Sequence, residues 1–174
     1  MEEKSMKLVL KELLKQFPNI DHLIFDFNGK DDLRKNIEPK INALNSVAAN
    51  FVILQDQDRG DCIKLKAKLQ SLVPNHSHNK TIIRIVCREL ESWFLADFDA
   101  LIRVYGPKVN DYRNQQRFRN PDELDFPVRE IETIIPNYSK GIGSAAIASH
   151  LNLNSNRSPS FQILIRTLDT LSNR

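Results

Sequence analysis

The sequence predicts a mixed α/β domain with a mostly parallel sheet flanked by helices and a helical appendage at the C-terminal end. Through residues 1–105, short apolar runs typical of strands alternate with helical patterns, which favours parallel strands joined by right-handed crossovers. Residues 106–174 hold a polar stretch followed by helical patterns. The length of 174 residues suits one domain, so we expect residues 1–174 to form a single unit, with the second part a loop-rich and helical extension of the α/β core.

The first quarter of the chain predicts a helix, a strand and a second helix. Helical spacing of apolar residues predicts a helix over residues 6–16, and residues 23–27 predict a strand that Asn28 and Gly29 end. A further helix is expected from about Asp31, with Pro39 kinking or splitting it. The apolar residues that define the two helices are Leu10, Leu13, Leu14 and Phe17, then Leu33, Ile37, Ile41 and Leu44.

The next stretch predicts the centre of the sheet. The continuous apolar run at residues 51–54 is typical of a strand buried on both faces. Asp61 is expected to cap a helix that begins near Cys62. A polar loop should follow at residues 74–80, then a third strand at 81–86. One long helix is predicted from about Arg88 to Tyr105.

The second half predicts loops and helices only. Residues 106–128 are polar and rich in arginine, asparagine and glutamine, which favours a loop-rich segment. Helices are expected near residues 128–135, 141–150 and 159–171.

Composition and charge exclude several classes of protein. No apolar run approaches the roughly 20 residues that a membrane span needs, and the charged start at residues 1–4 is unlike a secretory signal. Cys62 and Cys87 are too few for a disulfide framework or a zinc pattern. We therefore expect reduced thiols, a cytoplasmic location and no membrane partner. The net charge of +3 permits contact with a polyanion without arguing for one.

Polar residues follow each predicted strand, at the point where an α/β sheet binds ligands. Lys30 follows the first strand, Asp56 and Asp58 the second, and Arg88 and Glu91 the third. We expect these side chains to meet along one edge of the sheet.

Asp56 and Asp58 are the sharpest candidates. Residues two apart on an extended segment point the same way, so both carboxylates can meet one cation. Two close carboxylates repel each other unless a metal or proton lies between them, and hard oxygen ligands suit Mg²⁺ or Mn²⁺. The alternative interpretation is that both residues are surface turn and capping groups.

Two further groups carry weaker signals. Arg88, Glu89 and Glu91 open a predicted helix, where acidic residues are favoured by the helix dipole alone and where Arg88 and Glu91 could simply pair. Lys140 precedes a Gly-Ile-Gly-Ser stretch near a helix start, where backbone N–H groups could meet a phosphate, although an ordinary turn explains the same residues.

Several blocks, in the same order, resemble one family. They are residues 27–33, 52–58 with 61–62 and 65–66, 84–85 with 88–97, 120–122, 138–140 and 156–162. Together they resemble a domain-of-unknown-function family of small bacterial proteins, numbered four-two-seven-six, of the Toprim-like group. The most recognisable block is Arg88 to Asp97.

The resemblance implies a Toprim-like fold and a Toprim site. Toprim domains of primases, topoisomerases and nucleases of the overcoming-lysogenisation-defect type use a Glu after a first strand and an Asp-x-Asp after a later one. Asp56 and Asp58 match the pair that holds magnesium, and Glu2 matches the Glu that is a metal ligand or general acid or base. Glu3 stands where many Toprim domains have Gly. Only Met1 precedes Glu2, so we expect the first strand to be missing or supplied from upstream.

The resulting hypothesis is a Mg²⁺- or Mn²⁺-dependent nuclease that acts on phosphodiester bonds of nucleic acid, with a role in anti-phage or mobile-element defence beside a partner ATPase. Its metal ligands would be Asp56, Asp58 and Glu2, with Glu2, Glu91, Lys30, Arg88 and Lys140 as catalytic groups. The alternative is a non-catalytic Toprim-related module that binds nucleic acid or a partner ATPase. An acid pair supported by Glu2 or Glu91 would favour chemistry, and a pair neutralised by Lys30 or Arg88 would favour binding.

Overall fold

The computed structural model describes residues 3–173, which form a mixed α/β structure. Within that range the helices and strands, in chain order, are α1 (Lys4–Leu14), α2 (Lys30–Ala43), β1 (Phe51–Asp56), α3 (Cys62–Gln70), β2 (Thr81–Val86), α4 (Glu91–Leu95), α5 (Phe98–Tyr105), α6 (Pro127–Ile134), α7 (Ile142–Ala148) and α8 (Pro159–Ser172). Short 3-10 helices lie at Asn75–Lys80, Pro107–Tyr112, Gln116–Phe118 and Pro121–Glu123.

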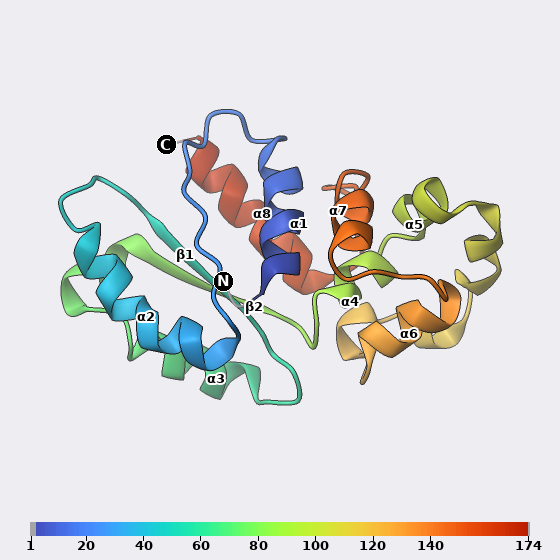
Figure 1. Ribbon diagram of the computed structural model, residues 1–174, viewed down its shortest axis with the longest axis horizontal. Coiled ribbons are helices and arrows are strands. Elements are labelled where there is room, and N and C mark those ends of the chain that lie inside the picture. The colour runs from blue at the N-terminus through green and yellow to red at the C-terminus, as the bar shows by residue number, and fades with distance from the viewer. Residues whose placement is uncertain (1–2, 174) are drawn as a thin grey trace.

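The sheet of the described residues consists of β1 and β2, which run parallel with α3 as the connection between them. The register pairs Phe51 with Thr81 and Asp56 with Val86, so the two strands end together. In Figure 1, α2 and α3 lie on one side of the strands, and α1 and α8 lie on the other. The predicted strands at 51–54 and 81–86 are confirmed, as is their parallel direction.

The two faces of the sheet belong to two separate apolar clusters. Ile53 and Ile83 pack with side chains of α2 and α3, whereas Leu54 and Val86 join a larger cluster formed by α1 and the helices of the second half. Adjacent residues of a strand point to opposite faces, so a strand that is covered on both faces favours apolar residues at successive positions. The prediction that residues 51–54 are buried on both faces is therefore confirmed.

The predicted strand at residues 23–27 is wrong. The segment is extended in Figure 1 and leads into α2, but it joins neither β1 nor β2 in a ladder. Ile24 packs against the larger cluster and Phe27 against the smaller one, while Leu23 is 78% exposed. Side-chain contacts hold the segment in place, including an ion pair between Lys7 of α1 and Asp26 at 2.5 Å. The segment therefore has the apolar pattern of a strand without pairing to one.

The predicted long helix from Arg88 to Tyr105 is also wrong, because it is divided into α4 and α5. Arg88 has a φ of +59°, which excludes it from a right-handed helix, and α4 begins only at Glu91. Asp97 then breaks the helix: its Oδ1 accepts a hydrogen bond from the backbone N–H of Ala100 at 3.1 Å and caps α5. Its Oδ2 accepts another from the backbone of Asn152 at 2.7 Å.

The remaining helices lie close to the predicted ranges, but the split that Pro39 was expected to cause in one of them does not occur. The α2 helix continues through Pro39 and is not split there, and Asp61 caps α3 by accepting from the backbone N–H of Lys64 at 2.8 Å. The helices α6, α7 and α8 occupy the three predicted ranges of the second half. Arg84 of β2 donates to Thr167 of α8 at 2.7 Å, so the last helix lies directly on the sheet. Among residues 3–173, no helix has the length and apolar character needed to cross a membrane.

The double role of Asp97 gives a stability prediction. Asp97→Ala removes the cap of α5 and leaves the N–H of Asn152 without its acceptor. We expect the free energy of unfolding to fall by about 1.5–2.5 kcal/mol, since a cap contributes about 1 kcal/mol and a further hydrogen bond about 0.5–1.5 kcal/mol. Urea unfolding followed by circular dichroism measures the change.

The matched control is Asp61→Ala, which removes only an exposed cap at α3. This variant should lose about 1 kcal/mol. Equal losses in the two variants would show that the bond from Asp97 to Asn152 adds nothing to stability.

Candidate functional site

The ends of β1 and β2 are held together beyond the strands themselves. The backbone N–H of Gln57 donates to the carbonyl of Val86 at 2.8 Å, and that of Asp58 donates to the carbonyl of Arg88 at 2.9 Å. The side chain of Gln57 accepts from the backbone N–H of Arg88 at 3.3 Å. These contacts fix the residues after one strand against the residues after the other, as the sequence predicts for a parallel pair.

Asp56 and Asp58 have different surroundings. Asp56 is the last residue of β1 and is 8% exposed, whereas the side chain of Asp58 is 47% exposed. Asp58 has a φ of +53°, so the chain leaves the extended conformation before it reaches this residue. The expected common direction of the two carboxylates depended on an extended segment, and the turn at Asp58 removes that basis.

Lys30 and Arg88 each pair with a carboxylate. The Nζ of Lys30, the first residue of α2, lies 3.3 Å from Oδ2 of Asp58. The predicted proximity of Lys30 and Asp58 is therefore confirmed. Arg88 points to a different partner, with its guanidinium 3.6 Å from Oδ1 of Asp125.

Glu91 is buried in a network of hydroxyl groups. It is 1% exposed, and the hydroxyl of Tyr138 donates to its Oε1 at 2.9 Å. The same hydroxyl lies 2.9 Å from Oγ of Ser144 on α7. Burial raises the pKa of Glu91, and the charge of Lys140 and the Tyr138 hydrogen bond only partly oppose that rise. Burial and the neighbouring Glu91 also raise the pKa of Tyr138, which keeps its proton available for the bond.

Lys140 is the cation around which the acidic residues gather. Burial acts to lower the pKa of Lys140, but the charges of Glu91, Glu3, Glu89 and Asp56 raise it above its ordinary value. Its Nζ lies 4.0 Å from Oε2 of Glu3. The charges of four carboxylates thus act on one ammonium group.

The four carboxylates come from separate parts of the chain. Glu3 precedes α1, Asp56 ends β1, and Glu89 and Glu91 follow β2. Glu89 accepts from the backbone N–H of Val128 at 3.0 Å, which joins the site to the start of α6. The segment that follows β2 is therefore joined to α6 by a side-chain hydrogen bond, in addition to the contacts of the sheet.

Sequence reasoning missed Glu3, Glu89 and Tyr138 as parts of the site. The signal for Tyr138 was its place two residues before Lys140, within one of the blocks that resemble the family. Gly143 makes room for the tyrosine: a Cβ there would lie 3.2 Å from the Tyr138 ring and 2.7 Å from the hydroxyl of Tyr105. Gly143 of the Gly-Ile-Gly-Ser stretch is therefore explained by side-chain packing.

Glu2, which the sequence predicts as a metal ligand and catalytic group, lies outside the described residues. Within residues 3–173, no group of three or more His, Cys, Asp or Glu side chains is arranged to hold a metal ion. The donors that are present are carboxylate oxygens, which suit a hard cation. Mg²⁺ commonly uses one or two protein carboxylates, with water and substrate phosphates as its other ligands, so this donor set fits Mg²⁺ better than a cation that needs a full protein cage.

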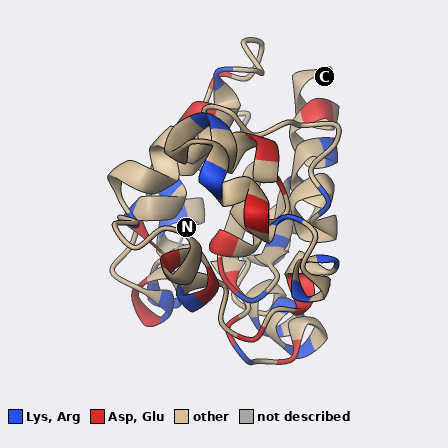
Figure 2. Cartoon of the chain, turned by 90° about the vertical axis from the view of Figure 1, so that its right-hand side faces the viewer, with Lys and Arg blue, Asp and Glu red and all other residues tan. Residues whose placement is uncertain are grey.

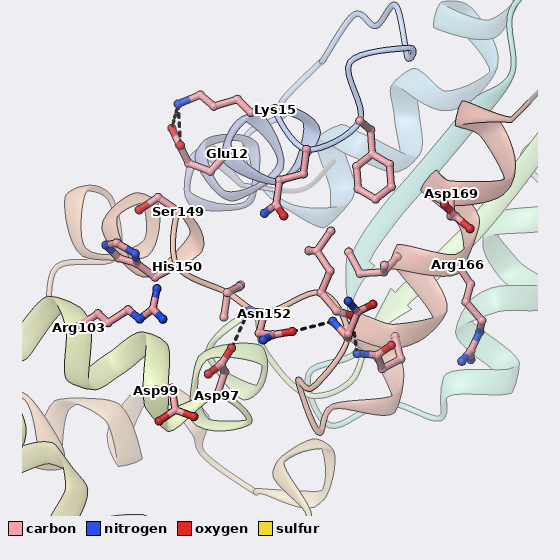
Figure 3. Close-up of a pocket in the computed structure, with 17 residues that line it drawn as sticks. Glu12, Lys15, Asp97, Asp99, Arg103, Ser149, His150, Asn152, Arg166 and Asp169 are labelled. Carbon is pink, nitrogen blue, oxygen red and sulfur yellow. Dashed lines mark hydrogen bonds and ion pairs between the residues drawn. The ribbon is translucent and has the colours of Figure 1, made fainter.

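Of two cavities in the described structure, one lies beside these residues and the other lies away from them. A cavity of about 370 Å³ adjoins Lys140 and Glu3 and is also lined by residues 27–29. A cavity of about 800 Å³ lies between α1, α5, α8 and the loop after α7 (Figure 3). The larger one contains none of the predicted site residues, and its charged lining mixes both signs, as does the chain as a whole in Figure 2. The smaller cavity is the one beside the acidic residues.

The fold and this site define a mixed α/β protein with an acidic, lysine-centred site at the carboxyl ends of two parallel strands. The family described as domain of unknown function DUF4276 matches residues 1–169, and the chain belongs to that family. No curated protein and no solved structure matches the chain significantly.

The burial of Glu91 predicts an unusual dependence of stability on pH. The folded state raises the pKa of this carboxyl above its ordinary value of 4.5. Stability from this group is therefore greatest below that value and falls as the pH rises toward the folded pKa. We expect Glu91→Gln, which cannot ionise, to unfold at higher urea concentration than the wild type at pH 7, with the difference absent at pH 4.

Tyr138→Phe is the companion variant. It removes a donor to the ionised carboxylate, so it should be less stable than the wild type at pH 7. Glu91→Gln being less stable than the wild type at pH 7 would contradict the account, because the electrostatic attraction of Lys140 would then outweigh the cost of burial.

Proposed function

We propose that this chain is a Mg²⁺- or Mn²⁺-dependent, Toprim-like nuclease that cleaves phosphodiester bonds of nucleic acid in the cytoplasm. The observation that supports the proposal is the group of four carboxylates at and near the strand ends, Asp56, Glu3, Glu89 and Glu91, whose charges all act on Lys140. Burying like charges together is costly unless a cation offsets them. A divalent ion held by carboxylates of this group would offset their mutual repulsion.

Asp56 and Asp58 would hold the metal, with Glu2 or Glu91 as further candidate ligands. When bound, the metal would polarise a phosphodiester oxygen or lower the pKa of a water molecule. The ion pair of Asp58 with Lys30 is half-exposed, so its loss on binding a metal would cost little. The turn conformation of Asp58 would then be the part of the site that adjusts.

Glu91, Lys140 and Lys30 would act on the substrate. Glu91 has a raised pKa and a hydrogen bond from Tyr138, which suit a group that exchanges a proton during a reaction. The ammonium groups of Lys140 and Lys30 would offset negative charge that develops on the phosphate. Arg88 pairs with Asp125 and would take part only after that pair opens.

A second function is favoured by a separate observation. Lys30 neutralises Asp58, and Lys140 stands among the other acids, so both halves of the site already contact a cation. This arrangement favours a non-catalytic Toprim-related module that binds nucleic acid or a partner ATPase. The resemblance to nucleases that work beside ATPases supports a role in anti-phage or mobile-element defence under either alternative.

Calorimetric titration with Mn²⁺ tests the metal site. We expect the wild type to bind Mn²⁺ and Asp58→Asn to bind it at least about tenfold more weakly, since the change removes an anionic ligand from a hard cation. The thermal melt of the variant should change little, because an exposed ion pair contributes about 0–1 kcal/mol.

The matched control is Asp61→Asn, an acid-to-amide change in the same loop. Asn caps a helix about as well as Asp, so this variant should keep both the fold and the Mn²⁺ affinity. Absence of Mn²⁺ binding by the wild type at millimolar concentration, with and without an oligonucleotide, would count against the metal site.

Cleavage of a labelled oligonucleotide separates the two functions. Metal-dependent cleavage that is lost in Asp56→Asn and in Glu91→Gln would support the nuclease. Binding of the oligonucleotide without cleavage in any divalent metal would support the binding module.

A further inference from the structure

An exposed phenylalanine and two arginines form a patch directly beside the acidic site. The Cζ atoms of Arg59 and Arg129 lie 4.6 Å and 4.8 Å from the centroid of the Phe126 ring. We call these three residues the Phe126 patch. Phe126 is 39% exposed, and within residues 3–173 neither guanidinium group forms an ion pair. The patch therefore presents an aromatic ring and two positive charges to solvent.

The patch is connected to the strand ends by specific contacts. Arg59 directly follows Asp58 in the chain. On the other side, Asp125 pairs with Arg88 at 3.6 Å, and the N–H of Val128 donates to Glu89 at 3.0 Å. The loop that carries Phe126 is thus fixed on both sides to residues that follow β2. A ligand on the Phe126 patch would lie next to the acidic site.

We propose that the Phe126 patch binds single-stranded nucleic acid and leads it to the acidic site; this inference rests on the proposed function and deepens it by naming the strandedness of the substrate. Bases in a duplex stack on one another, whereas an unpaired base has a free face for an aromatic ring or a guanidinium plane. Arginine also binds phosphate through paired N–H donors. The patch combines both kinds of group.

The acidic residues of the site give such a patch a role in binding nucleic acid. The carboxylates around Lys140 repel a phosphate backbone, and the basic residues of the chain are scattered among acidic ones (Figure 2). A polyanion therefore needs a local group of cations to hold it near the site. Arg59 and Arg129 supply two such charges at its border.

Fluorescence anisotropy with a labelled thymidine oligonucleotide of about 12 nucleotides tests the proposal, a length within the range that single-strand sites cover. Measurements in EDTA remove any metal or cleavage from the result. We expect Phe126→Ala to weaken binding by about 5- to 100-fold, as the loss of a stacking contact does. Phe126→Trp should keep the affinity of the wild type.

Salt dependence separates stacking from charge. Arg59→Ala should reduce the slope of log affinity against log salt by about 0.7, the value for one phosphate contact of a single strand. Phe126→Ala should leave this slope unchanged, because the ring releases no counterion.

Phe25 provides the matched control. It is also partly exposed and lies 4.9 Å from the Nζ of a cation, Lys40, but Lys40 is ten residues along α2 from Lys30 at the acidic site. Phe25→Ala should bind like the wild type, and thermal melts of all variants check that each is folded.

Several results would overturn the proposal. One is failure of the wild type to bind the oligonucleotide, and another is equal affinity of the wild type, Phe126→Ala and Arg59→Ala. Equal or tighter binding of a duplex of the same length would also contradict it. Equally effective competition by poly-glutamate would contradict it too, and would point to an acidic protein partner. Binding that depends on the patch in a protein that never cleaves would support this inference and contradict the nuclease.

Discussion

The parallel pairing of β1 with β2 is the constraint on which the rest of the structure depends. Because the strands run in the same direction and end together at Asp56 and Val86, the residues that directly follow one strand lie beside those that directly follow the other. Two backbone hydrogen bonds continue the pairing to Asp58 and Arg88. The acidic site and the Phe126 patch are both built on this junction, the first through Asp56 and Glu91, the second through Arg59.

Charge balance is the second determinant of the site. Buried carboxylates are unfavourable, and proteins keep them where a cation or a chemical role compensates. Here Lys140 provides part of the compensation, and the Tyr138 hydroxyl provides a further share through its bond to Glu91. The residues that complete the site come from before α1, from the end of β1, from after β2 and from before α7, so the site forms only when the whole fold is in place.

Backbone conformation points to the same place. Within residues 3–173, Asp58 and Arg88 are the non-glycine residues with positive φ, and they face each other across one hydrogen bond. A non-glycine residue in this region costs about 1–2 kcal/mol. Such strain gathers where a function requires a particular side-chain direction. The turn directs Asp58 to Lys30, and Arg88 to Asp125, which positions the loop of Phe126.

The sequence by itself determined the central strands, the helices that flank them and the cap at Asp61, because these follow from local periodicity and turn chemistry. Lys30 was also expected beside Asp58, but the strand on which that expectation rested does not form, so tertiary contacts place Lys30 there. Other features depended on contacts between distant residues. Residues 23–27 have the apolar pattern of a strand but no ladder partner among the described residues, and Asp97 divides a helix because it also binds the backbone of Asn152. The gathering of Glu3, Glu89 and Tyr138 around Lys140 and Glu91 was likewise decided only by tertiary structure, since burial and electrostatic neighbours are set by chain segments that are far apart in the sequence.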